Sequence, residues 1–217
     1  MRSSAEVDLD HALSTTRAVR KRLDLARPLP RELILECISL AVQAPTGSNR
    51  QGWQWVVVTD AGAKRAVGSH YSKSWYEYTA AGRPEYAEGD PRRKQLPRVV
   101  SSARYLADHM GEVPAMVIPC HEGRVDGPGT TNAEIAGLYG SILPAAWSFS
   151  LAARARGVGT TWTTLHLRYE REVAGLLGIP YERVTQAALI VAGFFKGADF
   201  KPAERIPLEG IVHWEHW

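Results

Sequence analysis

Apolar positions along the chain follow two periods, and these separate predicted helices from predicted strands. Apolar residues three or four positions apart give residues 31–44 one wide apolar face, and the same spacing makes 132–156 the longest predicted helix. Shorter helices are predicted at 8–16, about 60–70, 99–110 and 170–177. Runs rich in β-branched and aromatic residues predict strands at 53–59, 114–120, 160–164 and 186–194, with a last strand at 211–214.

These elements mix without a regular β–α–β alternation, so the pattern favours an α+β fold. Helices would cover a central mixed sheet of about four or five strands. The chain has 217 residues, enough for one domain with a full hydrophobic core. We therefore expect a single domain over 1–217.

Residues from about 71 to 97 interrupt the periodic pattern with polar, aromatic and glycine positions. Long segments of this kind are often functional, so we expect a lid or substrate-facing insertion around short helices. Trp75, Tyr76 and Tyr78 could stack on a flat aromatic acceptor. Packing of these rings in the core or between subunits is an equally good interpretation.

Composition narrows the classes of partner. The apolar fraction is 45%, the charged fraction is 23% and the net charge is only +3, which suits a globular protein with a small anionic ligand. Nucleic-acid binding is not expected, because only the stretch with Arg92, Arg93, Lys94 and Arg98 is densely basic.

Several common kinds of site are missing from the sequence. No CxxC or HExxH spacing exists, so no metal site is expected, and Cys37 and Cys120 are predicted to be buried thiols. There is no dinucleotide-binding GxGxxG, no phosphate-binding GK[ST] and no GxSxG. The longest apolar stretch, 187–195, is too short to cross a bilayer, so we expect a cytoplasmic protein without membrane association.

Two segments near the N-terminus carry candidate chemistry. Arg17 and Arg20 are three residues apart and could hold one phosphate between them, although a solvated basic patch is the simpler alternative. The segment APTGSNRQGW, 44–53, follows a predicted helix and offers hydroxyl and amide groups beside Gly47, where the backbone can approach a ligand closely. A polar connecting loop is the alternative for this segment.

The two segments together resemble a known family. TTRAVRKR at 15–22, followed by AVQAPTGSNRQGWQWVVV at 41–58, resembles the FMN-dependent nitroreductase family. Two later segments match in the same order, GVGTTWTTL at 157–165 and AERIPLEGIV at 203–212. The resemblance implies an α/β/α sandwich and an obligate homodimer, with the flavin site built from both subunits and helix 132–156 suited to the dimer seam.

The resemblance also implies roles for individual residues. Arg17 and Arg205 would contact the FMN phosphate, and Arg20 would lie near the N1 and O2 edge of the ring or the ribityl chain. Pro45, Thr46 and Gly47 would line the flavin, with Asn49 at its polar edge or ribityl group. The remaining implied cofactor-binding residues are Ala18 and Val19 in the first segment, and Trp162, Thr163 and Thr164 near flavin N5. Ala18 stands where many members have Ser.

The implied activity is an FMN-dependent NAD(P)H oxidoreductase of the nitroreductase type. NADH or NADPH would reduce the flavin by hydride transfer, and a nitroaromatic or quinone acceptor would then enter in a ping-pong cycle. No catalytic side chain is predicted, since water can supply protons. Two alternatives remain: a protein that stores or sequesters FMN with little turnover, and a reductive dehalogenase-like flavoenzyme. Lys73, Glu77 and Tyr78 are the residue types of the latter, but not at its spacing.

Overall fold

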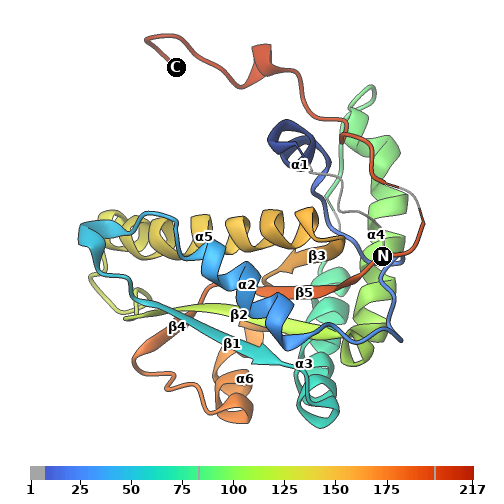
Figure 1. Cartoon of the computed structure of the whole chain (residues 1–217). Helices are drawn as coiled ribbons and strands as arrows, with labels where there is room; N and C mark the ends of the chain where they lie inside the picture. Colours follow the sequence, from blue (N-terminus) through green and yellow to red (C-terminus); the bar gives the residue numbers. More distant parts are fainter. Residues whose placement is uncertain (1–7, 83, 198) are drawn as a thin grey trace.

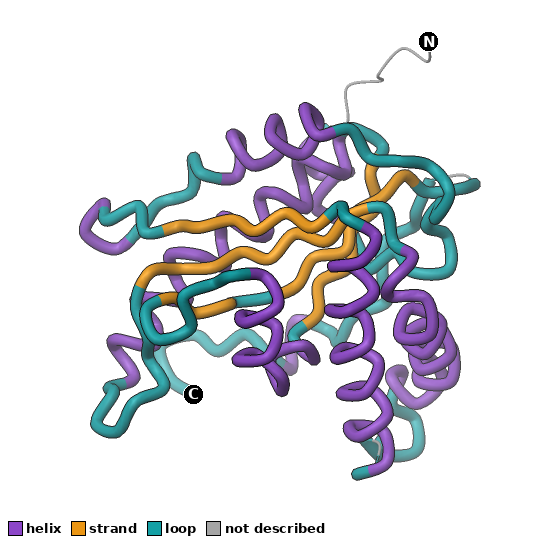
Figure 2. Tube along the Cα trace, turned by 90° about the horizontal axis from the view of Figure 1, so that it is seen from below, coloured by secondary structure: helices purple, strands orange, loops and turns teal. Residues whose placement is uncertain are grey.

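A five-stranded sheet forms the middle layer of the molecule. The computed structural model describes residues 8–82, 84–197 and 199–217. Its strands run in the order β1 (Trp53–Val58), β2 (Ala115–Glu122), β5 (Leu189–Phe194) and β3 (Val158–Thr163), and β4 (Val184–Gln186) also pairs with β2. Figure 1 shows this order, and Figure 2 shows the sheet between helices.

The ladders of the sheet are antiparallel throughout. Among the described residues, parallel pairing occurs only in isolated bridges, such as Ala18 with Thr160. The α+β fold with a central five-stranded sheet is confirmed. The expectation of a mixed sheet is wrong, because every strand pair in the sheet is antiparallel.

Helices cover both faces of the sheet. α2 (Arg31–Ala41) and α5 (Asn132–Ala155) lie on one face, while α3 (Ala61–Ala80), α4 (Pro91–His109) and α6 (Glu170–Leu177) lie on the other (Figure 1). The core accordingly has one large apolar cluster on each face and a third, small one around Leu138, Ile142 and Ala187. The remaining helical elements are α1 (Leu9–Thr15) and the short 3-10 turns η1 (Gly47–Asn49), η2 (Met110–Glu112), η3 (Leu165–Tyr169) and η4 (Leu208–Gly210).

Local signals explain where the best-predicted helices begin and end. α5 starts with a capping box in which the Thr131 hydroxyl and the Glu134 carboxylate satisfy each other's backbone N–H groups. α6 ends where Gly178 takes a left-handed conformation, φ 67°, which costs glycine nothing. In the part of the chain that is described, α5 is the one helix long and apolar enough to cross a membrane, a test that core helices of soluble proteins also pass.

The prediction of irregular structure at 71–97 is wrong, because most of this segment is helical. α3 continues through it to Ala80, and α4 begins at Pro91, where the proline occupies the first helical turn and the Asp90 carboxylate caps the Arg92 N–H. Only the short stretch 81–90 separates the two helices. Aromatic residues in α3 keep the helical period, with Tyr71 and Trp75 on its buried face.

Two strand predictions also need correction. The single strand expected at 186–194 is divided, because β4 ends at Gln186 and β5 starts at Leu189. Residues 211–214 form a turn and extended chain rather than a strand, because no described strand lies beside them.

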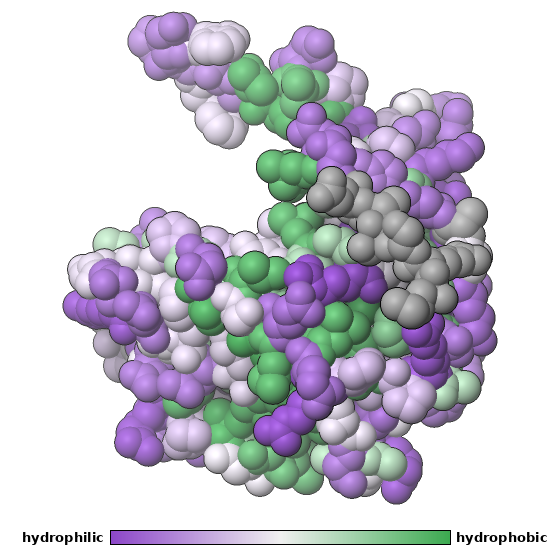
Figure 3. Space-filling view, in the orientation of Figure 1, coloured by the Kyte–Doolittle hydropathy of each residue, from purple (hydrophilic) through white to green (hydrophobic). Residues whose placement is uncertain are grey.

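An arm made of α1 and the C-terminal segment 199–217 projects from the body beyond the end of α5, which α1 contacts (Figure 1). The segment from 206 onward, here called the tail, is exposed throughout and carries several large apolar side chains. Figure 3 shows apolar side chains along the hollow between this arm and the body. Large exposed apolar residues of α1, α2 and α5 are Leu9, Leu13, Leu35, Leu40 and Trp147.

Candidate functional site

A pocket rich in cations lies where the segment 17–22 meets α4 and residues 200–205. Its volume is about 520 Å³. We call it the cationic pocket. Its charged lining residues are six cations and no carboxylates: Arg17, Arg20, Lys21, Arg22, Arg98 and Arg205. Such a lining suits an anionic ligand, and phosphate above all, because guanidinium groups bind oxyanions through paired hydrogen bonds.

The inner wall of the pocket is fixed to strand β3. The backbone N–H of Val19 donates to Thr160 O at 2.9 Å, and the Thr161 hydroxyl donates to Val19 O at 2.5 Å. The Val19 side chain is buried in the core. Gly159 allows this close packing, since a Cβ there would lie 2.9 Å from the Val19 side chain. Val19 therefore gives the pocket its rigidity, while its own polar groups already have partners.

Hydroxyl groups of α4 orient two of the cations. Arg20 Nη1 donates to Ser102 Oγ at 3.2 Å, and Lys21 Nζ donates to Ser101 Oγ at 2.8 Å. Burial lowers the pKa of Arg20 from its ordinary value, but a guanidinium remains protonated. Because their partners are neutral, both side chains keep an unbalanced positive charge.

The end of β3 lies beside Arg20. The Thr163 side chain hydrogen-bonds to the buried Tyr71 hydroxyl, whose pKa is raised by burial, and Tyr71 also interacts electrostatically with Arg20. Trp162 points to the opposite face of the sheet and packs against the α2–α5 cluster. Thr164 follows as the cap of η3. The segment 17–20 therefore lies along β3 as far as its last residue, Thr163.

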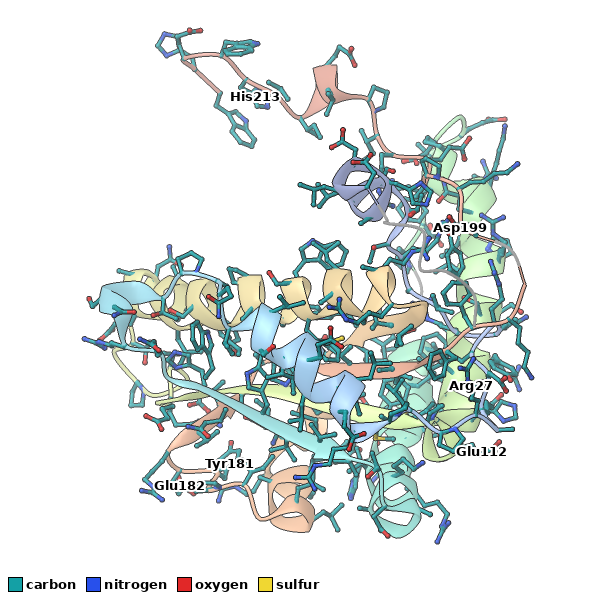
Figure 4. The ribbon with its side chains drawn as sticks, viewed as in Figure 1. Arg27, Glu112, Tyr181, Glu182, Asp199 and His213 are labelled. Carbon is teal, nitrogen blue, oxygen red and sulfur yellow. The ribbon has the colours of Figure 1, made fainter. Side chains whose placement is uncertain are left out.

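The C-terminal segment reaches the pocket through several anchors. Arg17 Nη1 donates to Lys201 O at 2.9 Å, and Gln95 Nε2 donates to Glu204 Oε2 at 3.2 Å. Asp199 accepts a hydrogen bond from the buried Arg154 guanidinium and pairs with His11 of α1. Figure 4 labels Asp199 at this junction and His213 far out on the tail. These anchors bring Arg205 to the lip of the pocket.

The loop 45–49 lies elsewhere. Gly47 N donates to Ser141 Oγ of α5 at 3.1 Å, whereas Arg154, further along α5, is the residue that contacts the arm. Arg154 follows Ser141 by thirteen positions along the helix, which is about 20 Å. No residue lines both the cationic pocket and the pockets next to this loop. Pro45, Thr46, Gly47 and Asn49 are therefore not brought to Arg17 and Arg205 within one chain (Figure 1).

This loop holds an unusual backbone conformation. Ser48, Asn49 and Gln51 all have φ near 50°, in the left-handed region that non-glycine residues seldom adopt. The strain is held by internal hydrogen bonds: Gln51 N donates to Thr46 Oγ1 at 3.2 Å and Gln51 Nε2 donates to Asn49 Oδ1 at 3.0 Å. Strained backbone of this kind gathers at ligand sites.

The three aromatic residues expected to face a substrate lie apart. Trp75 is buried in the core, so the packing interpretation holds for it. The Tyr76 hydroxyl donates to Asp108 Oδ1 at 2.5 Å, and Tyr78 is exposed.

Lys73 and Glu77 already engage a residue of η3. The Tyr169 hydroxyl donates to Glu77 Oε1 at 2.6 Å, and Lys73 Nζ lies 4.9 Å from the centre of the Tyr169 ring.

Sequence reasoning missed the contribution of α4. Arg98, Gln95 and Ser102 line the cationic pocket, although they lie about 80 residues from Arg17 in the chain. Their spacing of three and four residues does place them on one helix face, which was the available signal. Nothing in the sequence tells which neighbour that face contacts.

The fold and the pocket together define a class: a three-layer α+β protein with an anion pocket where its N-terminal and C-terminal segments meet. The chain belongs to the nitroreductase family, whose family model matches residues 13–194. A relative from Thermus thermophilus, described as NADH dehydrogenase, is 26% identical over 217 residues. That match covers 93% of this chain and 96% of the relative.

Solved structures share the fold at low sequence identity. Oxidised iodotyrosine deiodinase bound to FMN and 3-iodo-L-tyrosine aligns with a TM-score of 0.73 at 19% identity, covering 97% of this chain and 100% of the other. An FMN- and NADPH-dependent nitroreductase from Sphigopyxis sp. strain HMH aligns with a TM-score of 0.67 at 21% identity and the same coverage. A BluB-like flavoprotein from Clostridium difficile 630 aligns with a TM-score of 0.68 at 19% identity, covering 96% and 99%.

Proposed function

We propose that this protein is an FMN-dependent NAD(P)H oxidoreductase that reduces nitroaromatic or quinone-type acceptors. The observation that carries the proposal is the cationic pocket, placed directly beside the end of β3. Membership of the nitroreductase family supports it, as do FMN in the deiodinase complex and the FMN and NADPH dependence of the Sphigopyxis enzyme.

The residues present fit FMN. Arg17 and Arg205 would hold the phosphate, since both guanidinium groups line the pocket without a carboxylate partner among the described residues. Thr163 and the neighbouring backbone would lie along the ring. When bound, FMN supplies hydride acceptance from a reduced nicotinamide and electron delivery to an acceptor, in a ping-pong cycle.

Arg20 has the most specific task of the chain's own residues in this proposal. Its guanidinium is partly buried, held by Ser102 and adjacent to Tyr71 and Thr163. A fixed positive charge in such a site stabilises negative charge nearby without reorganisation. Arg20 would therefore favour the reduced state of the cofactor. No side-chain acid or base is required.

A homodimer would complete the site. The loop 45–49 contacts α5 at Ser141, about 20 Å along the helix from Arg154, which contacts the arm. In a dimer, the loop would instead meet a flavin held at the cationic pocket of the second copy. Apolar side chains gather along the hollow beneath the arm, and α1, α2 and α5 each expose large apolar residues that a second copy would cover. This arrangement also gives the strained conformation of the loop a purpose.

Flavin content tests the proposal directly. The purified protein should be yellow and release FMN on denaturation. Arg17→Ala and Arg205→Ala should each lower FMN affinity roughly tenfold or more, because each removes a charge-assisted phosphate contact. Arg104→Ala is the matched control: its exposed guanidinium pairs with Asp108, outside the pocket. Unchanged flavin content in both pocket variants would refute the assignment.

Steady-state oxidation of NADH or NADPH with a nitroaromatic or quinone acceptor separates an enzyme from a flavin-storing protein. Turnover above that of free FMN supports the proposal, and its absence in a flavin-loaded protein supports storage. The dehalogenase alternative gains nothing from Lys73 and Glu77, because both already contact Tyr169.

A further inference from the structure

The cationic pocket carries more positive charge than one flavin phosphate needs. Five of its six cations, Arg17, Arg20, Lys21, Arg98 and Arg205, pair with no carboxylate among the described residues. A phosphate monoester carries about −1.5 to −2 charges at neutral pH. After FMN binds, the pocket would retain a surplus of roughly three positive charges, enough to bind a second anion.

One of these unpaired cations, Arg98, lies on α4. Arg98 lines the pocket together with Gln95 and Ser102, one helical turn away on either side. Lys94 precedes Arg98 by four residues and is exposed, so it extends the same face toward solvent. Lys94 and Arg98 form no ion pair with any residue that the structure describes. Arg104 of the same helix differs, because Asp108 pairs with it.

This inference rests on the proposed function, which indicates what the second anion is. Nitroaromatic and quinone acceptors bear no phosphate, whereas the nicotinamide donors do. NADH and NADPH share a pyrophosphate and differ only in the 2′-phosphate of the adenosine, a dianionic monoester of the kind that a guanidinium fork binds well. Arg is also the residue that accommodates this phosphate in other NADP sites.

We propose that Arg98 and Lys94 of α4 form a subsite for the adenosine 2′-phosphate, which makes NADPH the preferred electron donor. The subsite lies at the solvent-facing rim of the cationic pocket. FMN would occupy the inner part, between Arg17 and the end of β3. The donor would then lie with its adenosine end across α4.

Donor specificity provides the first test. The holoenzyme should show a lower KM for NADPH than for NADH. Arg98→Ala should raise the ratio of KM(NADPH) to KM(NADH) roughly tenfold or more, the effect of losing one charge-assisted contact. Arg98→Lys should recover part of that loss, and Arg104→Ala should leave the ratio unchanged. An unchanged ratio in Arg98→Ala would refute the subsite.

A ligand without the nicotinamide provides the second test. With FMN bound, adenosine 2′,5′-bisphosphate should bind the protein at least tenfold more tightly than adenosine 5′-monophosphate, as measured by calorimetry. Arg98→Ala and Lys94→Ala should reduce this difference. Equal binding of the two nucleotides would refute the proposal.

These tests separate failure of the subsite from failure of the proposed function. If the FMN-loaded protein oxidises neither donor, the proposed function is wrong and the subsite falls with it. If both donors are used equally well, only the subsite is wrong. If Arg98→Ala loses FMN and affects both donors alike, Arg98 belongs to the flavin phosphate site, and the subsite is again refuted.

Discussion

Gly159→Ala is the sharpest test of how the cationic pocket is built. The added Cβ would lie 2.9 Å from three atoms of Val19 at once: Cβ, Cγ1 and Cγ2. A rotation of the valine side chain cannot relieve all three contacts, because Cβ itself is among them and β-branched side chains have few rotamers. The segment 17–20 must therefore move away from β3 as a unit.

Two effects should follow from this movement. Overpacking of this kind costs about 1–3 kcal/mol, and a chain of this size loses about 2–4 °C in Tm for each kcal/mol. We expect Tm to fall by roughly 2–12 °C. Displacement would also stretch the bond of 2.9 Å from Val19 N to Thr160 O, shift Arg17 and Arg20, and lower FMN affinity.

The measurements are thermal unfolding at fixed protein concentration and titration of the apoprotein with FMN. Gly175→Ala is the matched control, because a Cβ there meets nothing within 4 Å and helix α6 should gain about 0.5–1 kcal/mol. In the double variant Gly159→Ala/Val19→Ala, the penalty should be smaller than the sum of the single ones. If Gly159→Ala kept both the Tm and the FMN affinity of the unmodified protein, the described packing would be wrong.

Three further predictions concern other parts of the fold. Burial lowers the pKa of His166 to about 3, so the unfolded chain binds the extra proton below about pH 6.5. Stability should fall as pH drops from there toward 3, and His166→Phe should flatten that slope in urea titrations at several pH values; equal slopes would contradict it. Ser141→Ala removes the acceptor for Gly47 N and should cost about 1 kcal/mol; a larger loss of FMN affinity than of stability would tie the loop 45–49 to the flavin. Thr131→Ala breaks the capping box and should cost about 1 kcal/mol without altering flavin content, a result that Thr131→Ser should largely reverse.

The fold was largely predictable where local chemistry decides it. The helix at 170–177 matches α6 at both ends, because Gly178 and Pro180 make continuation costly. The helix at 132–156 ends within one residue of the prediction for similar reasons. The last expected strand failed, because an apolar run becomes a strand only beside a partner, and the described chain offers none next to 211–214.

The site was predictable in part. Arg17, Arg20 and Arg205 do line one pocket, even though nearly 190 residues separate the first from the last. The wall from α4 was missed, since its proximity depends on tertiary packing that no local pattern records. The separation of Thr46 and Gly47 from Arg17 is likewise a property of the whole fold, set by where Ser141 and Arg154 fall along α5.

The exposed tail carries tryptophan residues whose fluorescence should report whether the tail is covered. Two of the seven tryptophans, Trp214 and Trp217, stand in solvent there, whereas Trp75 is buried in the core. Their indole emission should lie at long wavelength and be quenched readily by iodide while the tail is free. Any partner that covers the tail should shift that emission toward shorter wavelengths and protect it. Association could therefore be followed by intrinsic fluorescence alone, without attaching a dye.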